Sequence, residues 1–256
     1  MLYPEDKMKT HWDLFITLVL LFSCCVTPYR LAFIEVESQK WMTINYVIDS
    51  LFFTDIIIIF NSAYNDDDYR LIEDRGVIAK NYLHGWFLID VMAIIPFDLV
   101  FSGNQFNEII RITRIGRLYK LVKLTKLIRI LKIVKERGKL AQYVQEFLKI
   151  GIGFERLIIF IFSFLMLIHI VACMWVMTTQ LENEGVETWM TLGGYDDNTP
   201  GGRYLVSFYF TVQTITTVGY GDMDITTPTE MIFCTMIMII GVISFTFASG
   251  SLASIL

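Results

Sequence analysis

Charged residues are scarce in this chain of 256 residues. They make up 18% of it, against about a quarter of an ordinary soluble domain, while 54% of the residues belong to the hydrophobic set. This composition excludes a disordered chain and argues against a soluble enzyme. The apolar residues gather in runs long enough to cross a membrane, which takes about 20 mostly apolar residues in a helix.

Cysteine and histidine are also rare, with four and three copies. The cysteines lie inside apolar runs without C-x-x-C spacing, which argues against a metal or disulfide framework and favours small buried side chains. The histidines form no H-x-x-x-H pair, and no nucleophile–base pair, phosphate-binding loop or dinucleotide motif is present. The sequence therefore predicts a protein that is not an enzyme.

Apolar runs predict six membrane helices and one re-entrant segment. Acidic residues precede the first run and no small-x-small site follows it, so it is not a cleaved signal peptide. Pro28 is expected to interrupt the first helix near its end, and Pro96 to kink or end the third. An acidic loop, 65–75, should separate the second helix from the third. The expected helices are 14–34, 45–64, 82–101, 106–139, 154–178 and 229–256, and the re-entrant segment includes 204–216.

The fourth of these segments is strongly basic. It holds eleven basic residues and one acid between Arg111 and Lys139, whereas the rest of the chain has ten basic and 25 acidic residues. Nine of the cations recur at every third position. They are Arg111, Arg114, Arg117, Lys120, Lys123, Lys126, Arg129, Lys132 and Lys135.

Spacing by three spreads these cations around a helix. Each step advances about −60° at the α-helical period, so no single polar face forms. This argues against a helix lying flat on a membrane, a nucleic-acid-binding helix and a solvated face, whereas 3₁₀ geometry would align the charges in one stripe. The 24 residue-to-residue steps from the first to the last cation span about 36 Å of α-helix, enough to cross a membrane core of about 30 Å. The pattern predicts a voltage-sensing helix, with Arg111 to Arg129 as its sensing charges and Lys132 and Lys135 near the linker or lipid phosphates.

Acidic side chains in the expected second and third helices fit this interpretation. Asp49, Asp55 and Asp90 lie within apolar runs, where an ionised carboxylate is costly without a partner or water. The basic segment is the part of the chain with cations to spare. We therefore expect it to supply their partners.

The sequence Thr-Thr-Val-Gly-Tyr-Gly-Asp at 216–222 resembles the selectivity filter of potassium channels. There, backbone carbonyls of Thr217, Val218, Gly219 and Tyr220, with the Thr217 hydroxyl, would replace the water shell of potassium ions. Gly219 and Gly221 permit the positive φ that this alignment needs. A glycine-rich turn is the alternative, but the position after an amphipathic segment and between two long apolar helices favours a filter. One copy supplies a quarter of each carbonyl ring, so four chains are needed.

The whole sequence resembles the transmembrane part of the channels that carry a cyclic-nucleotide-binding domain: the ether-à-go-go, hyperpolarisation-activated and cyclic-nucleotide-gated groups. The similar motifs are Pro4 with Trp12-Asp13, Asp49-x-x-Phe52-x-x-Asp55, Asn81-Tyr82-Leu83 with Trp86-Phe87-x-x-Asp90, and Ile95-Pro96-Phe97-Asp98. The resemblance implies that Phe52, Asp55 and Asp90 form a charge-transfer centre, with Asp49 and Asp98 as outer acids. A buried core aromatic is the alternative for Phe52. Phe210 stands where the family commonly has Trp.

The resemblance implies an all-α membrane protein of six transmembrane helices that assembles as a tetramer. Residues 1–139 would form a four-helix voltage sensor. Residues 140–256 would form a pore domain of fifth helix, pore helix, filter and sixth helix. The expected partners are three identical or homologous subunits and membrane lipids, with no nucleic acid, in the plasma membrane. Potassium would occupy the filter, and a cyclic nucleotide would act only through a domain that this chain does not contain.

Several functions stay open at this point. The filter string resembles the potassium-selective branches, whereas the length of the basic repeat is similar to that of the hyperpolarisation-activated group. The alternatives to a voltage-gated potassium channel are a weakly selective, hyperpolarisation-activated or cyclic-nucleotide-modulated cation channel, a silent modulatory subunit, and a sensor coupled to an enzyme. The sequence leaves the direction of gating open.

Overall fold

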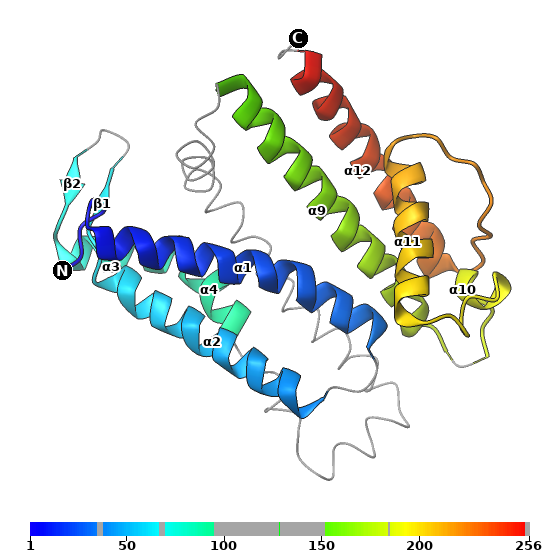
Figure 1. The fold of residues 1–256 in the computed structure, drawn as a ribbon, viewed down its shortest axis with the longest axis horizontal. Coiled ribbons are helices and arrows are strands. Elements are labelled where there is room, and N and C mark those ends of the chain that lie inside the picture. Colours follow the sequence, from blue (N-terminus) through cyan, green and yellow to red (C-terminus); the bar gives the residue numbers. More distant parts are fainter. Residues whose placement is uncertain (35–37, 67–69, 95–127, 129–151, 184, 254–256) are drawn as a thin grey trace. The chain divides into compact units, whose positions relative to one another are not determined.

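The computed structural model describes residues 1–34, 38–66, 70–94, 128, 152–183 and 185–253. The expected fourth helix, except Ile128, therefore lies outside the described residues, as do Asp98 and Pro96. What is described is helical apart from one short hairpin (Figure 1). The chain forms two compact units, and the first helix, α1 (Lys7–Phe33), contributes to both, because the division falls after Cys24.

The first unit holds the start of α1, α2 (Gln39–Phe60), α3 (Arg75–His84) and α4 (Phe87–Ile94). Strands β1 (Tyr64–Asn65) and β2 (Leu71–Ile72) pair antiparallel in the acidic loop between α2 and α3. Helix α2 packs against both α3 and α4. The N-terminus is tied to the end of α2, since Leu2 donates to the Asn61 carbonyl (3.0 Å) and accepts from the Ala63 N–H (2.9 Å).

The expected third helix differs from the observed one. Instead of one helix over 82–101, α3 begins at Arg75, and a break at Gly85 and Trp86 separates it from α4. The early start has a local cause: the Asp74 side chain accepts hydrogen bonds from the N–H groups of Gly76 (2.7 Å) and Val77 (3.4 Å). Such a cap satisfies donors that a helix start leaves open.

The second unit holds the end of α1, α9 (Ile152–Leu181), α10 (Trp189–Leu192), α11 (Pro200–Ile215) and α12 (Pro228–Ala253). Helices α9, α11 and α12 pack against one another, with the short α11 beside the two long helices (Figure 1). Their common core contains four buried aliphatic side chains. These are Ile168, Val171, Ile215 and Ile237.

The predicted interruption at Pro28 is wrong, because α1 continues through this residue to Phe33. Proline lacks an N–H and so leaves a carbonyl of the preceding turn without its helical donor. Side chains of α9 bind two other carbonyls in this part of α1: His169 Nε2 lies 2.8 Å from the Cys25 carbonyl oxygen, and Gln180 Nε2 lies 2.7 Å from that of Ala32. The C-terminal part of α1 is thus hydrogen-bonded to α9.

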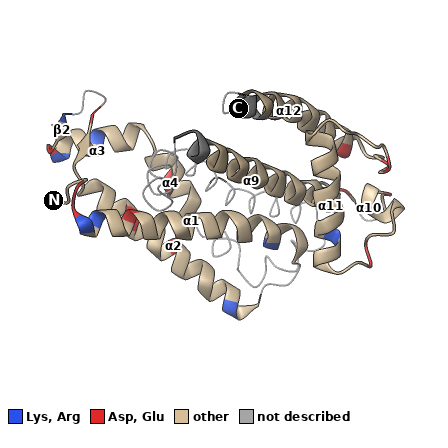
Figure 2. Cartoon of the chain, turned by 45° about the horizontal axis from the view of Figure 1, so that its top comes forward, with Lys and Arg blue, Asp and Glu red and all other residues tan. Residues whose placement is uncertain are grey.

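Four described helices are long and apolar enough to cross a membrane: α1, α2, the Leu157–Leu181 part of α9 and the Pro228–Phe247 part of α12. Figure 2 shows almost no positions of Lys, Arg, Asp or Glu along the described parts of α9 and α12. Of the other two expected spans, the third is represented by α3 and α4, and the fourth, except Ile128, lies outside the described residues.

Candidate functional site

Helix α11 leads directly into the filter-like sequence. The helix begins at Pro200, after Thr199, whose hydroxyl accepts from the Gly202 N–H (3.2 Å), and it ends at Ile215. Ile215 is fully buried. A Cβ placed on Gly241 of α12 would lie 3.0 Å from the Ile215 Cα. Glycine at 241 therefore lets α12 approach the end of α11 at the point where the filter-like strand begins.

The backbone of this strand alternates. Thr217, Gly219 and Gly221 have positive φ values of 61°, 59° and 71°, whereas Val218 and Tyr220 between them do not. Two of the three positions are glycines, which adopt such values at no steric cost, and Thr217 is the one described non-glycine residue that does so. The pattern fits the prediction that Gly219 and Gly221 permit an unusual carbonyl alignment.

Gln213 of α11 binds three successive N–H groups of the strand. Its backbone carbonyl accepts from Val218 (2.9 Å) and Gly219 (3.2 Å), and its Oε1 accepts from Tyr220 (3.1 Å). The N–H and C=O of a trans peptide point in opposite directions, and the described chain has no cis peptide. The carbonyls of Thr217, Val218 and Gly219 therefore point away from Gln213. Successive carbonyls on one side can coordinate a dehydrated cation.

Asp222, just after the strand, is held by the same helix. Gln213 Nε2 donates to its Oδ1 (2.9 Å), and the Tyr209 hydroxyl donates to its Oδ2 (2.7 Å). The hydrogen bonds from Gln213 and Tyr209 lower the pKa of Asp222 below its ordinary value, because they stabilise the carboxylate form. Both ends of the strand are thus attached to α11.

Aromatic rings of α9, α10 and α12 pack next to α11. Trp175 of α9 is fully buried. Its ring stacks on Phe210 (centroids 4.7 Å apart), on Trp189 (5.2 Å) and on Phe233 (6.0 Å). Phe210 stands where the family that the sequence resembles commonly has Trp. Its ring still packs against an aromatic neighbour.

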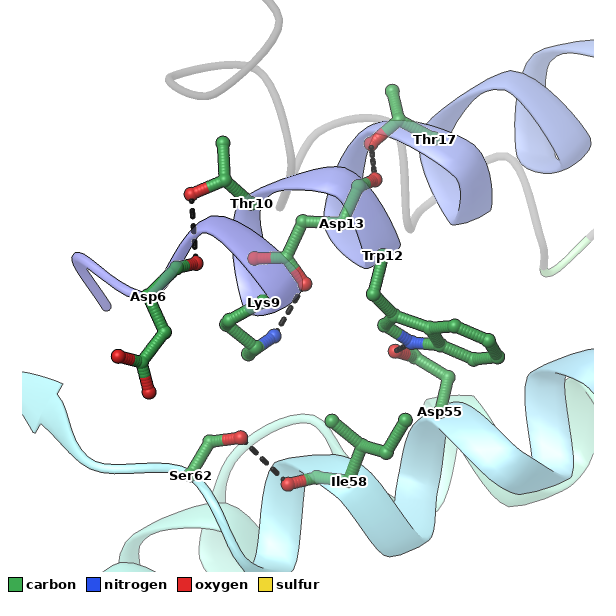
Figure 3. Close-up of polar contacts among 9 residues, drawn as sticks. All are labelled: Asp6, Lys9, Thr10, Trp12, Asp13, Thr17, Asp55, Ile58 and Ser62. Carbon is green, nitrogen blue, oxygen red and sulfur yellow. Dashed lines mark hydrogen bonds and ion pairs between the residues drawn. The ribbon is translucent and has the colours of Figure 1, made fainter. Parts of the chain in front are cut away.

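A second group of predicted residues lies in the first unit. Phe52 of α2 is 1% exposed. Asp55, one turn later, accepts a hydrogen bond of 3.0 Å from Trp12 Nε1 of α1. Figure 3 shows the indole of Trp12 pointing across to this carboxylate, and Lys9 pairing with Asp13 along α1. Asp49 is half-buried on the same helix.

Asp90 of α4 is buried, with 2% of its surface exposed. The Tyr82 hydroxyl of α3 donates to its Oδ2 (2.5 Å). The Tyr82 ring packs against the rings of Phe60 and Phe87, with centroids 5.1 and 5.7 Å away. The Asp90 carboxylate thus binds a tyrosine that belongs to a cluster of aromatic rings. The expected cationic partners, Arg111 to Arg129, lie outside the described residues, so their pairing stays a prediction.

Sequence reasoning missed four side chains that hold these sites. Gln213 and Tyr209 are polar residues of an amphipathic helix, and no local signal marks them as ligands of the following strand. Trp12 and Tyr82 stand within the family-like motifs, but those motifs do not tell which acid each of them binds.

Comparison with known proteins identifies the family of the chain. The profile of the family described as "ion transport protein" matches residues 9–253. The potassium voltage-gated channel unc-103 of Caenorhabditis elegans is 29% identical over 280 residues, covering 98% of this chain and 32% of that protein. The dog voltage-gated inwardly rectifying potassium channel KCNH2 is 27% identical, covering 98% and 22%. The human voltage-gated delayed rectifier potassium channel KCNH5 is 25% identical, covering 96% and 26%. The chain thus spans less than a third of the length of these relatives.

Proposed function

We propose that this chain, which belongs to the ion transport protein family, is one subunit of a tetrameric, voltage-gated, potassium-selective channel. The resemblance read from the sequence is confirmed, since relatives over nearly the whole chain are voltage-gated potassium channels of the ether-à-go-go type. The chain is accordingly an integral membrane protein of a channel family and not of an enzyme family.

The observation that carries the proposal is the attachment of the 217–221 strand to Gln213. Its N–H groups are taken up by α11, so the carbonyls of Thr217, Val218 and Gly219 are left on the opposite side. Together with the Tyr220 carbonyl and the Thr217 hydroxyl, they would form the potassium sites. The α11 C-terminus, which carries partial negative charge, ends beside them and favours a cation.

Four chains are proposed because one strand cannot enclose an ion. Val218 and Tyr220 are 53% and 72% exposed in the single chain, and α12 exposes large apolar side chains such as Ile239 and Phe247. Apolar surface of this extent needs cover. Neighbouring subunits around a fourfold axis, together with lipid, would supply it. We propose identical or homologous chains in the plasma membrane as these partners.

Voltage gating is proposed from the first unit and the basic segment. In a six-helix arrangement, residues 1–139 would form the sensor and 140–256 the pore. The cations Arg111 to Arg129 would pass Phe52, exchanging partners among Asp55, Asp90 and the outer acids Asp49 and Asp98. The burial of Asp90 and the hydrogen bond from Trp12 to Asp55 support this role. Acidic side chains within a membrane are costly and are usually paired with cations or other polar groups.

A second candidate is a weakly selective cation channel opened by hyperpolarisation. The unbroken repeat of nine cations favours it, since this length resembles that group. The filter string favours potassium selectivity, and a current record with steps in both voltage directions separates the two.

The conduction site is tested by Gly219→Ala, with Gly194→Ala as its matched control. Both glycines have positive φ, 59° and 65°, and a Cβ at either meets no atom within 4 Å, so both substitutions impose a similar strain of about 1–2 kcal/mol. Potassium current should vanish in Gly219→Ala and persist in Gly194→Ala, at equal surface expression. Selective current in Gly219→Ala would refute the assignment.

A further inference from the structure

Glu230 is a fully buried carboxylate in the first turn of α12. Its Oε2 accepts from the N–H groups of Thr226 (3.1 Å) and Thr227 (3.2 Å), and its Oε1 accepts from the Trp189 N–H (3.1 Å). The Thr226 hydroxyl lies 3.4 Å from Oε2. The three N–H donors are neutral, and a buried carboxyl group is costly unless hydrogen bonds of this kind satisfy it.

Part of this arrangement is an ordinary helix cap. The Glu230 N–H donates to the Thr227 hydroxyl (3.2 Å) while the Glu230 side chain accepts from the Thr227 N–H. This reciprocal pair is a capping box, and a carboxylate in the first turn also complements the positive end of α12. Capping accounts for the bonds to the start of α12, but it does not account for the bond to Trp189.

That further bond joins two separate segments. Trp189 is the first residue of α10, 41 positions earlier in the chain. One carboxylate therefore binds the N-terminal N–H groups at the starts of both α10 and α12. Thr226 adds a second link between the same segments, because its hydroxyl donates to the Glu187 carbonyl (2.7 Å).

Both segments connect to the proposed filter. The stretch from Asp222 to Thr226 leaves the filter strand, and it is held at one end by α11 through Asp222 and at the other by Glu230. The Trp189 ring stacks on Trp175, and Trp175 stacks on Phe210 of α11. The hydrogen bonds of Glu230 and these ring contacts therefore join the segment after the filter strand to α10, α9 and α11.

We propose that Glu230 is a positioning residue that holds the segment after the filter strand in its conducting shape. It does so by clamping Thr226 and Thr227 to the start of α10. Without the clamp, the exit of the filter deforms sooner during sustained opening, and the current decays faster. The inference rests on the proposed function, because it requires that the 217–221 strand conducts potassium.

The test compares Glu230→Gln with Glu187→Gln in the full-length channel expressed in oocytes. Glutamine has the same shape as glutamate, but an NH₂ group replaces one of the two carboxylate oxygens. This NH₂ group faces N–H donors and cannot accept a hydrogen bond from them. Glu187 is exposed and contributes its backbone carbonyl to the clamp, so Glu187→Gln removes an equal charge from the same region and leaves the hydrogen bonds in place. Current decay is recorded during long activating steps, at low and at high external potassium.

We expect Glu230→Gln to accelerate the decay about tenfold, the effect of losing one hydrogen bond to a charged group, and Glu187→Gln to leave it unchanged. High external potassium should reduce the difference, because ions bound to the conducting filter stabilise that shape by mass action. A role in folding alone would lower the surface amount without changing the decay or its potassium dependence.

An unchanged decay in Glu230→Gln at measurable current would overturn the inference, as would equal acceleration in Glu187→Gln. If Glu230→Gln does not reach the surface, Thr226→Val decides, since it removes the hydroxyl link and keeps the backbone N–H. Faster decay in Thr226→Val supports the clamp, and unchanged decay refutes it. A wild-type chain that carries no potassium current would instead refute the proposed function, and this inference with it.

Discussion

Replacing Gly241 by alanine should force α12 away from the end of α11. The added Cβ would lie 3.0 Å from the Ile215 Cα, 3.3 Å from the Ile215 carbonyl oxygen and 3.5 Å from that of Thr214. All three are backbone atoms, so no side chain can turn aside. Because Ile215 directly precedes the filter strand, the displacement would reach the conduction site.

The size of the effect follows from two opposing terms. Overpacking of this kind costs about 1–3 kcal/mol, and exchanging glycine for alanine inside a helix returns about 1 kcal/mol. Gly250→Ala separates the two terms, since Gly250 lies in the same helix and a Cβ there meets no atom within 4 Å. The two variants should therefore differ in stability by about 1–3 kcal/mol.

The assay is thermal unfolding of the detergent-solubilised, full-length protein, followed by potassium current at equal surface expression. Gly241→Ala should unfold at a lower temperature than Gly250→Ala and should carry less current per surface channel. Equal unfolding temperatures and equal currents for the two variants would refute the close approach of α12 to α11.

Other consequences concern the sensor and the strand's exit. Trp12→Phe removes a donor to the α2 carboxylate, worth about 1.5–3 kcal/mol. Three or four charges move in the field, and each is worth about 2.3 kcal/mol per 100 mV, so the voltage of half-activation should shift by about 15–45 mV. The shift should be toward voltages at which a cation of the basic segment pairs with the freed carboxylate. An unshifted conductance–voltage curve would contradict this. The hydrogen bond from Gln213, and then that from Tyr209, lower the pKa of Asp222. The ionised carboxylate therefore contributes fully to the stability of the folded protein above the ordinary pKa of aspartate. This contribution is lost only when the pH falls through the lowered pKa. External acidification from about pH 7 to 5 should therefore leave the filter's selectivity unchanged, and a loss of selectivity in this range would argue against an ionised Asp222. Arg114→Gln should reduce the gating charge measured from the limiting slope of conductance, whereas Lys135→Gln should not, and equal reductions would show that the basic helix does not move through the field as described.

Local signals in the sequence were sufficient for the long apolar helices and for the positive φ values at Gly219 and Gly221. Length and hydropathy identified α1, α2, α9 and α12, because a membrane-spanning helix must satisfy its backbone internally over a fixed thickness. Two further local signals were present and not used. They were Asp74 as the cap of α3, and Thr227 with Glu230 as the capping box of α12.

Contacts between segments that are distant in the chain could not be predicted from the sequence. The bond from Trp12 to Asp55 joins residues 43 positions apart, and that from His169 to the Cys25 carbonyl joins residues 144 apart. Pro28 illustrates the consequence, because local rules predict a break, whereas α1 continues to Phe33 and its C-terminal part is hydrogen-bonded to α9. Partners of buried polar groups are set by packing, which a single sequence does not specify.

The reversal potential of the current in mixed potassium and sodium solutions tests the central claim most directly. If carbonyls of Thr217 to Tyr220 replace the water shell of potassium, the reversal potential should follow the potassium equilibrium potential as external potassium is varied. It should also stay almost unchanged when external sodium is replaced by a large impermeant cation. A reversal potential that moves with sodium as strongly as with potassium would contradict a potassium-selective filter in this chain.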